Sequence, residues 1–148
     1  MILSRAGEYA VQVALHLACE RGRKYVPVHE LADRSGAPYH FLAKICQRLT
    51  QAGILESAKG QNGGVALARP AAEVTLLQVV EALGPLAAFH GCVLGLAECG
   101  DASPCPLHDD WGPIKKRIKE MLDGKNLAQF AGDLKTGKVS LTQGSATR

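Results

Sequence analysis

A glycine-rich turn, Gly60-Gln61-Asn62-Gly63-Gly64, constrains the fold of this chain more than any other segment. Short strand-like runs flank it at residues 54–58 and 65–68, and Pro70 closes the second run. The Asn-Gly pair is expected to supply the positive φ angles of a tight hairpin. The segment therefore predicts a small two-stranded ribbon.

Three amphipathic helices are expected before this ribbon. Ser4 can cap the first helix, whose apolar side chains recur at intervals of three and four. A second helix over 28–35 ends at Gly36, and Pro38 suits the first position of a third helix. The order of helix, glycine-containing turn, helix and ribbon is typical of a winged helix-turn-helix, with the ribbon as the wing.

The outer face of the third helix carries groups that suit DNA recognition. Basic and amide side chains can meet phosphates and base edges, and the start of such a helix usually enters the major groove. The wing tip can reach the neighbouring minor groove. A solvated polar surface is the alternative for each side chain taken singly. The candidate DNA-binding residues are Tyr39, His40, Lys44, Gln47, Arg48, Lys59, Gln61 and Asn62.

The second half of the chain predicts a helix, a loop and a longer helix. Thr75 begins a mostly apolar helix that ends at Gly84-Pro85, residues 86–104 lack helical periodicity, and a long amphipathic helix resumes at Pro106. That helix is expected to pack against the first helix or a second subunit. The expected domains are 1–72, the winged helix-turn-helix; 73–131, the linker helix, cysteine loop and dimerisation helix; and 132–148, a flexible tail. The fold class is mainly α with a small β-wing.

Three of the five cysteines fall within or just after the glycine-rich loop, and a histidine follows the last by three positions. These residues, Cys92, Cys99, Cys105 and His108, offer four soft metal ligands. A disulfide is the weakest interpretation, because the clustered number is odd. Structural zinc usually involves a closely spaced cysteine pair, which is missing here, so the spacing slightly favours an iron–sulfur cluster. Cys19 and Cys46 are interpreted as small buried hydrophobes.

Composition narrows the classes of function. The net charge is +3, and the excess lies in residues 1–75, which carry nine basic and six acidic side chains against eight of each in the remainder. No apolar stretch is long enough to span a membrane, and the apolar N-terminus fits an amphipathic helix better than an export signal, so the chain is expected to be cytoplasmic. No phosphate loop, G-x-S-x-G motif or pair of catalytic carboxylates is recognised, so neither an enzyme nor a small-molecule substrate is expected.

The chain resembles the Rrf2 family of bacterial regulators from Met1 to about Ala131. The resemblance rests on LSRAGEYAVQVALHLA, LAKICQRLTQAGILESAKGQNGGVALARP, VTLLQVVEAL and CPLHDDWGPIKKRIKEMLDGKNLAQFA. Two wing positions depart from the family, which usually has Arg in place of Lys59 and an aromatic residue in place of Val65. The resemblance implies a homodimer that binds a pseudo-palindromic double-stranded DNA operator.

The resemblance also implies that Cys92, Cys99 and Cys105 bind an iron–sulfur cluster. IscR-like members end the motif in Cys-x₂-His, as Cys105 and His108 do, which favours a two-iron (2Fe-2S) cluster. NsrR-like members take an acidic residue of the first helix around a four-iron (4Fe-4S) cluster, and Glu8 stands at that position. Six residues separate Cys92 from Cys99, where IscR-like members commonly have five.

The resulting hypothesis is a transcriptional regulator whose operator binding is controlled by an iron–sulfur cluster that senses iron–sulfur status, redox state or nitric oxide. Pinning the cysteine loop would fix the angle between the two DNA-reading helices of a dimer, whose half-sites lie about 34 Å apart. A zinc-stabilised or thiol-based winged-helix regulator is the alternative.

Overall fold

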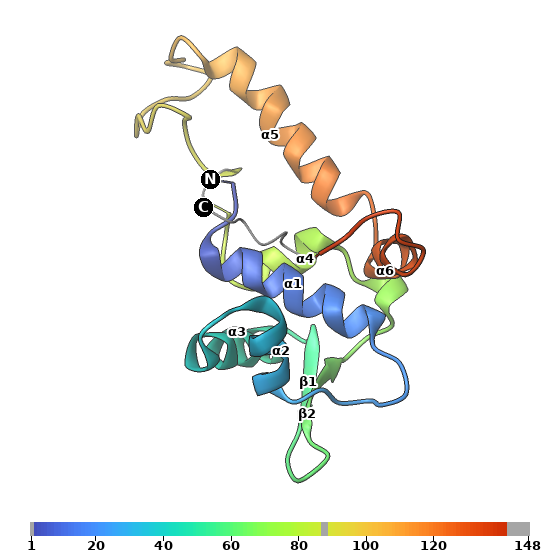
Figure 1. Cartoon of the computed structure of the whole chain (residues 1–148). Coiled ribbons are helices and arrows are strands. Elements are labelled where there is room, and N and C mark those ends of the chain that lie inside the picture. Colours follow the sequence, from blue (N-terminus) through green and yellow to red (C-terminus); the bar gives the residue numbers. More distant parts are fainter. Residues whose placement is uncertain (1, 87–88, 142–148) are drawn as a thin grey trace, which may run out of the picture.

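A computed structural model describes residues 2–86 and 89–141 of the chain. Its helices and one two-stranded sheet, which projects from the edge of the helical part (Figure 1), confirm the expected fold, mainly α with a small β-wing. No helix in these two ranges combines the length and apolarity that a bilayer crossing requires. The elements are α1 (Arg5–Cys19), α2 (Val28–Ser35), α3 (Tyr39–Gln51), β1 (Leu55–Ala58), β2 (Gly64–Leu67), η1 (Ala71–Glu73), α4 (Leu76–Glu81), α5 (His108–Asp123) and α6 (Leu127–Lys135).

The core of the winged head forms where α1, α2 and α3 meet. The Ser4 hydroxyl caps α1 by accepting a hydrogen bond from the backbone N–H of Gly7 at 3.1 Å. Gly36 ends α2 in the left-handed conformation, which lets the chain turn directly into α3. The fully buried side chains include Leu31 of α2 and Leu42 and Leu49 of α3. This apolar contact fixes the helix-turn-helix and leaves the opposite face of α3 to solvent.

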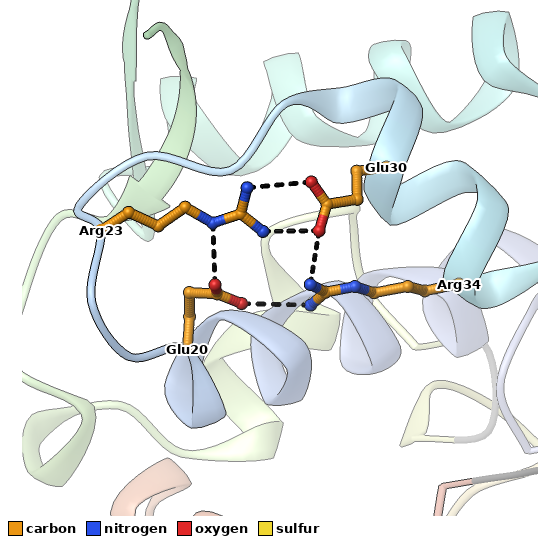
Figure 2. Close-up of polar contacts among 4 residues, drawn as sticks. All are labelled: Glu20, Arg23, Glu30 and Arg34. Carbon is orange, nitrogen blue, oxygen red and sulfur yellow. Dashed lines mark hydrogen bonds and ion pairs between the residues drawn. The ribbon is translucent and has the colours of Figure 1, made fainter.

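A ring of alternating charges joins the end of α1 to α2 (Figure 2). Arg23 donates to Glu20 at 2.8 Å and to Glu30 at 2.9 Å. Arg34 donates to Glu20 at 3.1 Å and also binds Glu30. Each carboxylate therefore meets two guanidinium groups, and the ring ties the α1–α2 connection to the helix-turn-helix.

The wing is an antiparallel hairpin with Leu55 opposite Leu67 and Ala58 opposite Gly64. Val26, in the extended segment before α2, forms a further bridge to Val65. The expectation that Asn-Gly supplies the positive φ angles is wrong, because these angles occur at Gly60 (104°) and Gly64 (144°) and at no non-glycine residue described. The turn is thus longer than a two-residue hairpin, and its tip residues project freely.

Helices α4 and α5 form a second, smaller core. Thr75 and Gln78 form a capping box at the start of α4. Leu77 and Val80 of α4 pack with Leu122 near the end of α5. Of the two partners expected for the long helix, α1 is not the main one within the chain: α5 packs chiefly on α4, and most of it extends away from the head (Figure 1).

Helix α6 was not expected from the sequence. Asn126 and Gln129 form a capping box at its start, and the helix packs against α1. It continues to Lys135, with Leu134 packed against the main core, so the boundary expected after residue 131 falls inside a helix. The part of the expected tail at 142–148 lies outside the described residues.

Candidate metal centre and nucleic-acid interface

Three cysteine sulfur atoms converge beside the start of α5. The Sγ atoms of Cys92, Cys99 and Cys105 all lie within 4.8 Å of one another, and each residue is half-buried. This is the one group of three or more potential metal ligands among the residues that the structure describes. The sequence separates these thiols by up to 13 positions, so the turns of the loop bring them together.

Backbone N–H groups donate hydrogen bonds to two of these sulfur atoms. The amide of Leu94 donates to Cys92 at 3.4 Å, and the amide of Cys105 donates to Cys99 at 3.4 Å. Hydrogen bonds from the Leu96 and Leu94 amides, with smaller contributions from Cys105 and Cys99, lower the pKa of Cys92 to about 7. Desolvation and the neighbouring Cys92 raise the pKa of Cys105. A sulfur ionised near neutral pH is the form that binds metals.

His108, the first residue of α5, adds a nitrogen atom to this cluster. Its Nδ1 lies 3.3 Å from Cys99 Sγ, and its Nε2 lies 3.0 Å from an Asp101 carboxylate oxygen. Hydrogen bonds with Cys99 and Asp101 raise the pKa of the imidazole. Asp101 is not among the residues predicted from the sequence, where its one signal is an acidic side chain two positions after a candidate ligand.

The sulfur atoms line a partly open pocket rather than a packed core. A cavity of about 340 Å³ is lined by the three cysteines, His108, Asp101, Trp111 and Lys115, together with two glycines. The Trp111 indole N–H donates to the Gly91 carbonyl at 3.3 Å, which ties the start of the loop to α5. The site therefore has both the donors and the space for an inorganic group.

The donor set fits a metal or an iron–sulfur centre. Two ligands of one tetrahedral metal ion lie about 3.6–3.8 Å apart, given metal–sulfur and metal–nitrogen bonds of about 2.3 and 2.1 Å. Cys92 and Cys105 are close to this separation at 3.3 Å, and so are Cys99 and His108 at 3.3 Å. Three thiols and an imidazole are donors that iron–sulfur proteins use.

The remaining candidate ligands lie elsewhere. Glu8 of α1 is partly exposed and pairs with Arg5 at 3.9 Å, and it is not among the metal-ligand group of the described chain. Cys46 is 3% exposed, and burial raises the pKa of its thiol to about 11, as expected for a small core residue. Cys19 is half-buried, so it is less enclosed than expected.

Most of the proposed DNA-contacting side chains share the outer surface of α3. Tyr39, His40, Lys44 and Gln47 are all exposed, and Tyr39 retains half of its accessible surface (50%). The rings of Tyr39 and His40 make an edge-to-face contact with 5.3 Å between centroids. A basic side chain, an amide and two aromatic rings therefore lie along the first three turns of α3.

Arg48 differs from the other candidates on α3. Its guanidinium donates a hydrogen bond to the carbonyl of Leu83, just beyond the end of α4. The side chain therefore joins α3 to the segment that leads into the cysteine loop. This contact places Arg48 on the α4 side of α3.

The three wing candidates, Lys59, Gln61 and Asn62, are exposed at the hairpin tip. The conformation of this tip depends on glycine. A Cβ atom at Gly63 would lie 2.3 Å from the Ala58 carbonyl oxygen, so no other residue fits there without movement of the backbone. The wing tip and the cysteine loop lie at opposite ends of the molecule (Figure 1). If the loop controls DNA binding, a structural change at the cysteines must therefore pass through the head to reach the wing.

The winged head and the polar face of α3 define a winged-helix transcriptional regulator, with a cysteine group that can bind metal. Comparison with known proteins gives its family. The chain belongs to the Rrf2 family, whose model is described as an iron-dependent transcriptional regulator and matches residues 3–133. The resemblance found in the sequence is thus confirmed.

Individual relatives agree with this assignment. The chain is 40% identical to protein aau3 of Rhizobium meliloti over 112 residues, which are 76% of this chain and 69% of that protein. Its structure is similar to that of T. potens IscR, with a TM-score of 0.74, 26% identity and coverage of 97% of this chain and 94% of the other. CymR, the global cysteine regulator of B. subtilis, shares the fold with a TM-score of 0.75 at 24% identity, over 89% of this chain and 97% of that one.

Proposed function

We propose that this protein is a dimeric DNA-binding regulator whose operator affinity depends on an iron–sulfur cluster held by Cys92, Cys99, Cys105 and His108. The single observation that carries the proposal is the convergence of three sulfur atoms within 4.8 Å beside an imidazole. When bound, such a cluster supplies a redox-active and reagent-sensitive group at the loop. The cluster would sense iron–sulfur status, redox state or nitric oxide.

The resemblance to IscR-like members favours a two-iron cluster over zinc, because their motif also ends in Cys-x₂-His, as Cys105 and His108 do. The imidazole of His108 is 3.3 Å from Cys99 and lies just outside the group whose ligand atoms are all within 4.8 Å of each other. A four-iron cluster with Glu8 from a partner subunit remains the second candidate, and zinc is the third.

The DNA-binding surface in this proposal comprises the exposed face of α3 and the wing. Lys44 and Gln47 would contact bases or phosphates in the major groove, with Tyr39 and His40 at the entering end of α3. Lys59, Gln61 and Asn62 would meet the backbone or the minor groove. For Arg48, the bond to the Leu83 carbonyl supports a role in holding α3 against α4 rather than in reading a base.

The dimer in this proposal forms through α5. Ile114 and Met121 of α5 are 49% and 61% exposed, although they lie on the apolar side of an amphipathic helix. A second copy packed along this side would bury them and bring two winged heads into a fixed relation. The cysteine loop leads directly into α5, so ligation would restrict the loop and the orientation of the heads.

Anaerobic purification tests the metal proposal. The protein should show visible absorbance and contain iron and acid-labile sulfide. Cys99→Ala should lose both, whereas the matched control Cys19→Ala should keep them, because Cys19 lies outside the ligand group. Zinc without labile sulfide, or a full iron complement in Cys99→Ala, would overturn the assignment.

Binding to DNA from the protein's own promoter region tests the second half of the proposal. Lys44→Ala should weaken binding and, if the lysine meets a phosphate, should reduce the salt dependence by about one unit of slope. Lys116→Ala, which removes an exposed charge from α5, is the control and should leave binding unchanged. Equal effects of both substitutions would remove α3 from the proposed interface.

A further inference from the structure

The imidazole of His108 lies between two side chains that contact different ring nitrogens. Nδ1 is 3.3 Å from Cys99 Sγ, and Nε2 is 3.0 Å from Asp101 Oδ1. A 180° turn of the ring would place carbon atoms at both positions and break both contacts. The two neighbours together therefore define the orientation of the ring.

The Asp101 contact also selects a tautomer. An ionised carboxylate only accepts hydrogen bonds, so Nε2 must carry the proton of this contact. In the neutral ring, the lone pair then resides on Nδ1, which faces Cys99. A neutral imidazole nitrogen with a free lone pair is the form that binds a metal ion.

The loop itself delivers Asp101 to this position. Gly100 and Ser103 exchange two backbone hydrogen bonds, of 3.3 and 3.0 Å, and so close a tight turn directly after Cys99. Asp101 lies in that turn, and its side chain is otherwise fully exposed. The same turn thus carries a thiolate ligand on one side and the partner of the imidazole on the other.

We propose that Asp101 is a positioning residue that presents Nδ1 of His108 to the metal centre, where His108 and Cys99 bind the same metal ion. The proposal rests on the proposed function, because it requires a metal centre at the cysteines. A carboxylate behind a histidine ligand also increases the basicity of the ligand, and loss of such partners typically lowers metal affinity about 10- to 100-fold.

Nitrogen labelling of the unaltered protein gives the most direct test. The anaerobically prepared holoprotein is made with histidine carrying ¹⁵N only at Nδ1, and separately only at Nε2, and then reduced. Pulsed EPR should show the strong hyperfine coupling of a directly bound nitrogen with the Nδ1 label and a weak coupling with the Nε2 label. His108→Cys should abolish the strong signal. The reverse pattern would overturn the proposal.

Variants test the role of Asp101 itself. Asp101→Ala should release iron to a chelator at least about tenfold faster and raise the midpoint potential, because a less basic ligand stabilises the oxidised state less. Asp101→Asn should have a smaller effect, since its amide oxygen can still accept from Nε2. Asp109→Asn is the matched control, because it removes an exposed carboxylate next to His108 that belongs to the first turn of α5.

The outcomes separate the two proposals. A holoprotein with iron and labile sulfide in which Asp101→Ala and Asp109→Asn behave alike would overturn the role of Asp101 alone. A wild-type protein that contains zinc and no labile sulfide would overturn the proposed function, and this inference with it.

Discussion

Gly64 is the position at which one added methyl group should disturb the wing most. The residue begins β2 with a φ of 144°, and a Cβ atom there would lie 2.2 Å from the Val26 carbonyl oxygen. The positive φ of Gly64 and the close carbonyl oxygen of Val26 are both features of the backbone, so no side-chain movement can relieve the strain. In Gly64→Ala, β2 must therefore separate from the extended segment at Val26.

The cost of this separation can be estimated from the contacts that it breaks. Val26 and Val65 exchange two backbone hydrogen bonds, each of 2.9 Å. Losing each costs about 0.5–1.5 kcal/mol, and holding alanine in a region of φ that favours glycine costs about 1–3 kcal/mol. We therefore expect Gly64→Ala to lower the free energy of unfolding by about 2–6 kcal/mol.

Gly60→Ala is the matched control for this substitution. Gly60 also has a positive φ, of 104°, but an added Cβ there would meet no atom within 4 Å. Its expected cost is the backbone contribution alone, about 1–3 kcal/mol. Urea denaturation followed by circular dichroism at one fixed protein concentration measures both variants, because dimerisation would make stability depend on concentration.

The two variants should also differ in DNA binding. Gly64→Ala displaces the hairpin from the head, so affinity for promoter DNA should fall even where the protein remains folded. If Gly64→Ala unfolds at the same urea concentration as Gly60→Ala, the bridge between Val26 and Val65 does not hold the wing, and the reasoning fails.

Three further predictions concern the head and α6. Hydrogen bonding with Arg23 lowers the pKa of Glu20 from its ordinary value of 4.5, so the ionised carboxylate stabilises the fold at pH values above 4.5, and this contribution is lost as the pH falls through the lowered pKa. Glu20→Gln should therefore lower the stability measured in thermal melts by up to about 1 kcal/mol at pH 7, and the difference from wild type should shrink in acid. Arg48→Met removes the bond to the Leu83 carbonyl and should cost about 1 kcal/mol in urea denaturation, with no loss if that bond does not form in solution. Gly132→Ala, exposed in α6 with no atom within 4 Å of the added methyl, should raise stability by about 0.5–1 kcal/mol, and a decrease would contradict the helix.

The sequence predicts the winged head well because its signals are local. Spacing of apolar residues at three and four identifies α1 and α3, and Gly36 and Pro38 mark the turn between α2 and α3. The elements, the two wing strands included, begin and end within one or two residues of the expected positions. What differs at the wing is the backbone of the turn, whose positive φ angles lie at Gly60 and Gly64 rather than at the Asn-Gly pair.

Helix α6 shows how a strong local signal can be missed. Asn126 and Gln129 have the spacing of a capping box, but polar residues around Gly132 suggested a tail. The helix is stabilised by its contact with α1, more than 100 positions earlier in the chain. The apolar residues that make this contact, Leu127, Phe130 and Leu134, recur at intervals of three and four, so the sequence does carry a periodic signal for α6.

The metal-ligand group could be proposed from residue types, whereas its geometry could not. Cysteine and histidine identities suggested a metal, but spacing alone did not separate iron–sulfur from zinc. The pairing of Cys99 with His108, and of His108 with Asp101, depends on the turn at Gly100 and on where α5 begins. These features follow from backbone hydrogen bonds rather than from sequence patterns.

Helix α4 is the element through which the cysteine loop and the DNA-binding surface can affect each other. Its apolar side packs against Leu122 of α5, and the Leu83 carbonyl just after it accepts a hydrogen bond from Arg48 of α3. Cys92 follows Leu83 by nine positions, so a restraint on Cys92 would act close in the chain to the segment that Arg48 holds. A shift of this segment would reach α3 without crossing the main core, because the Arg48 contact lies at the surface. Arg48→Met should therefore uncouple DNA affinity from cluster occupancy more than it weakens DNA binding itself, whereas loss of binding in both states would indicate a direct DNA contact.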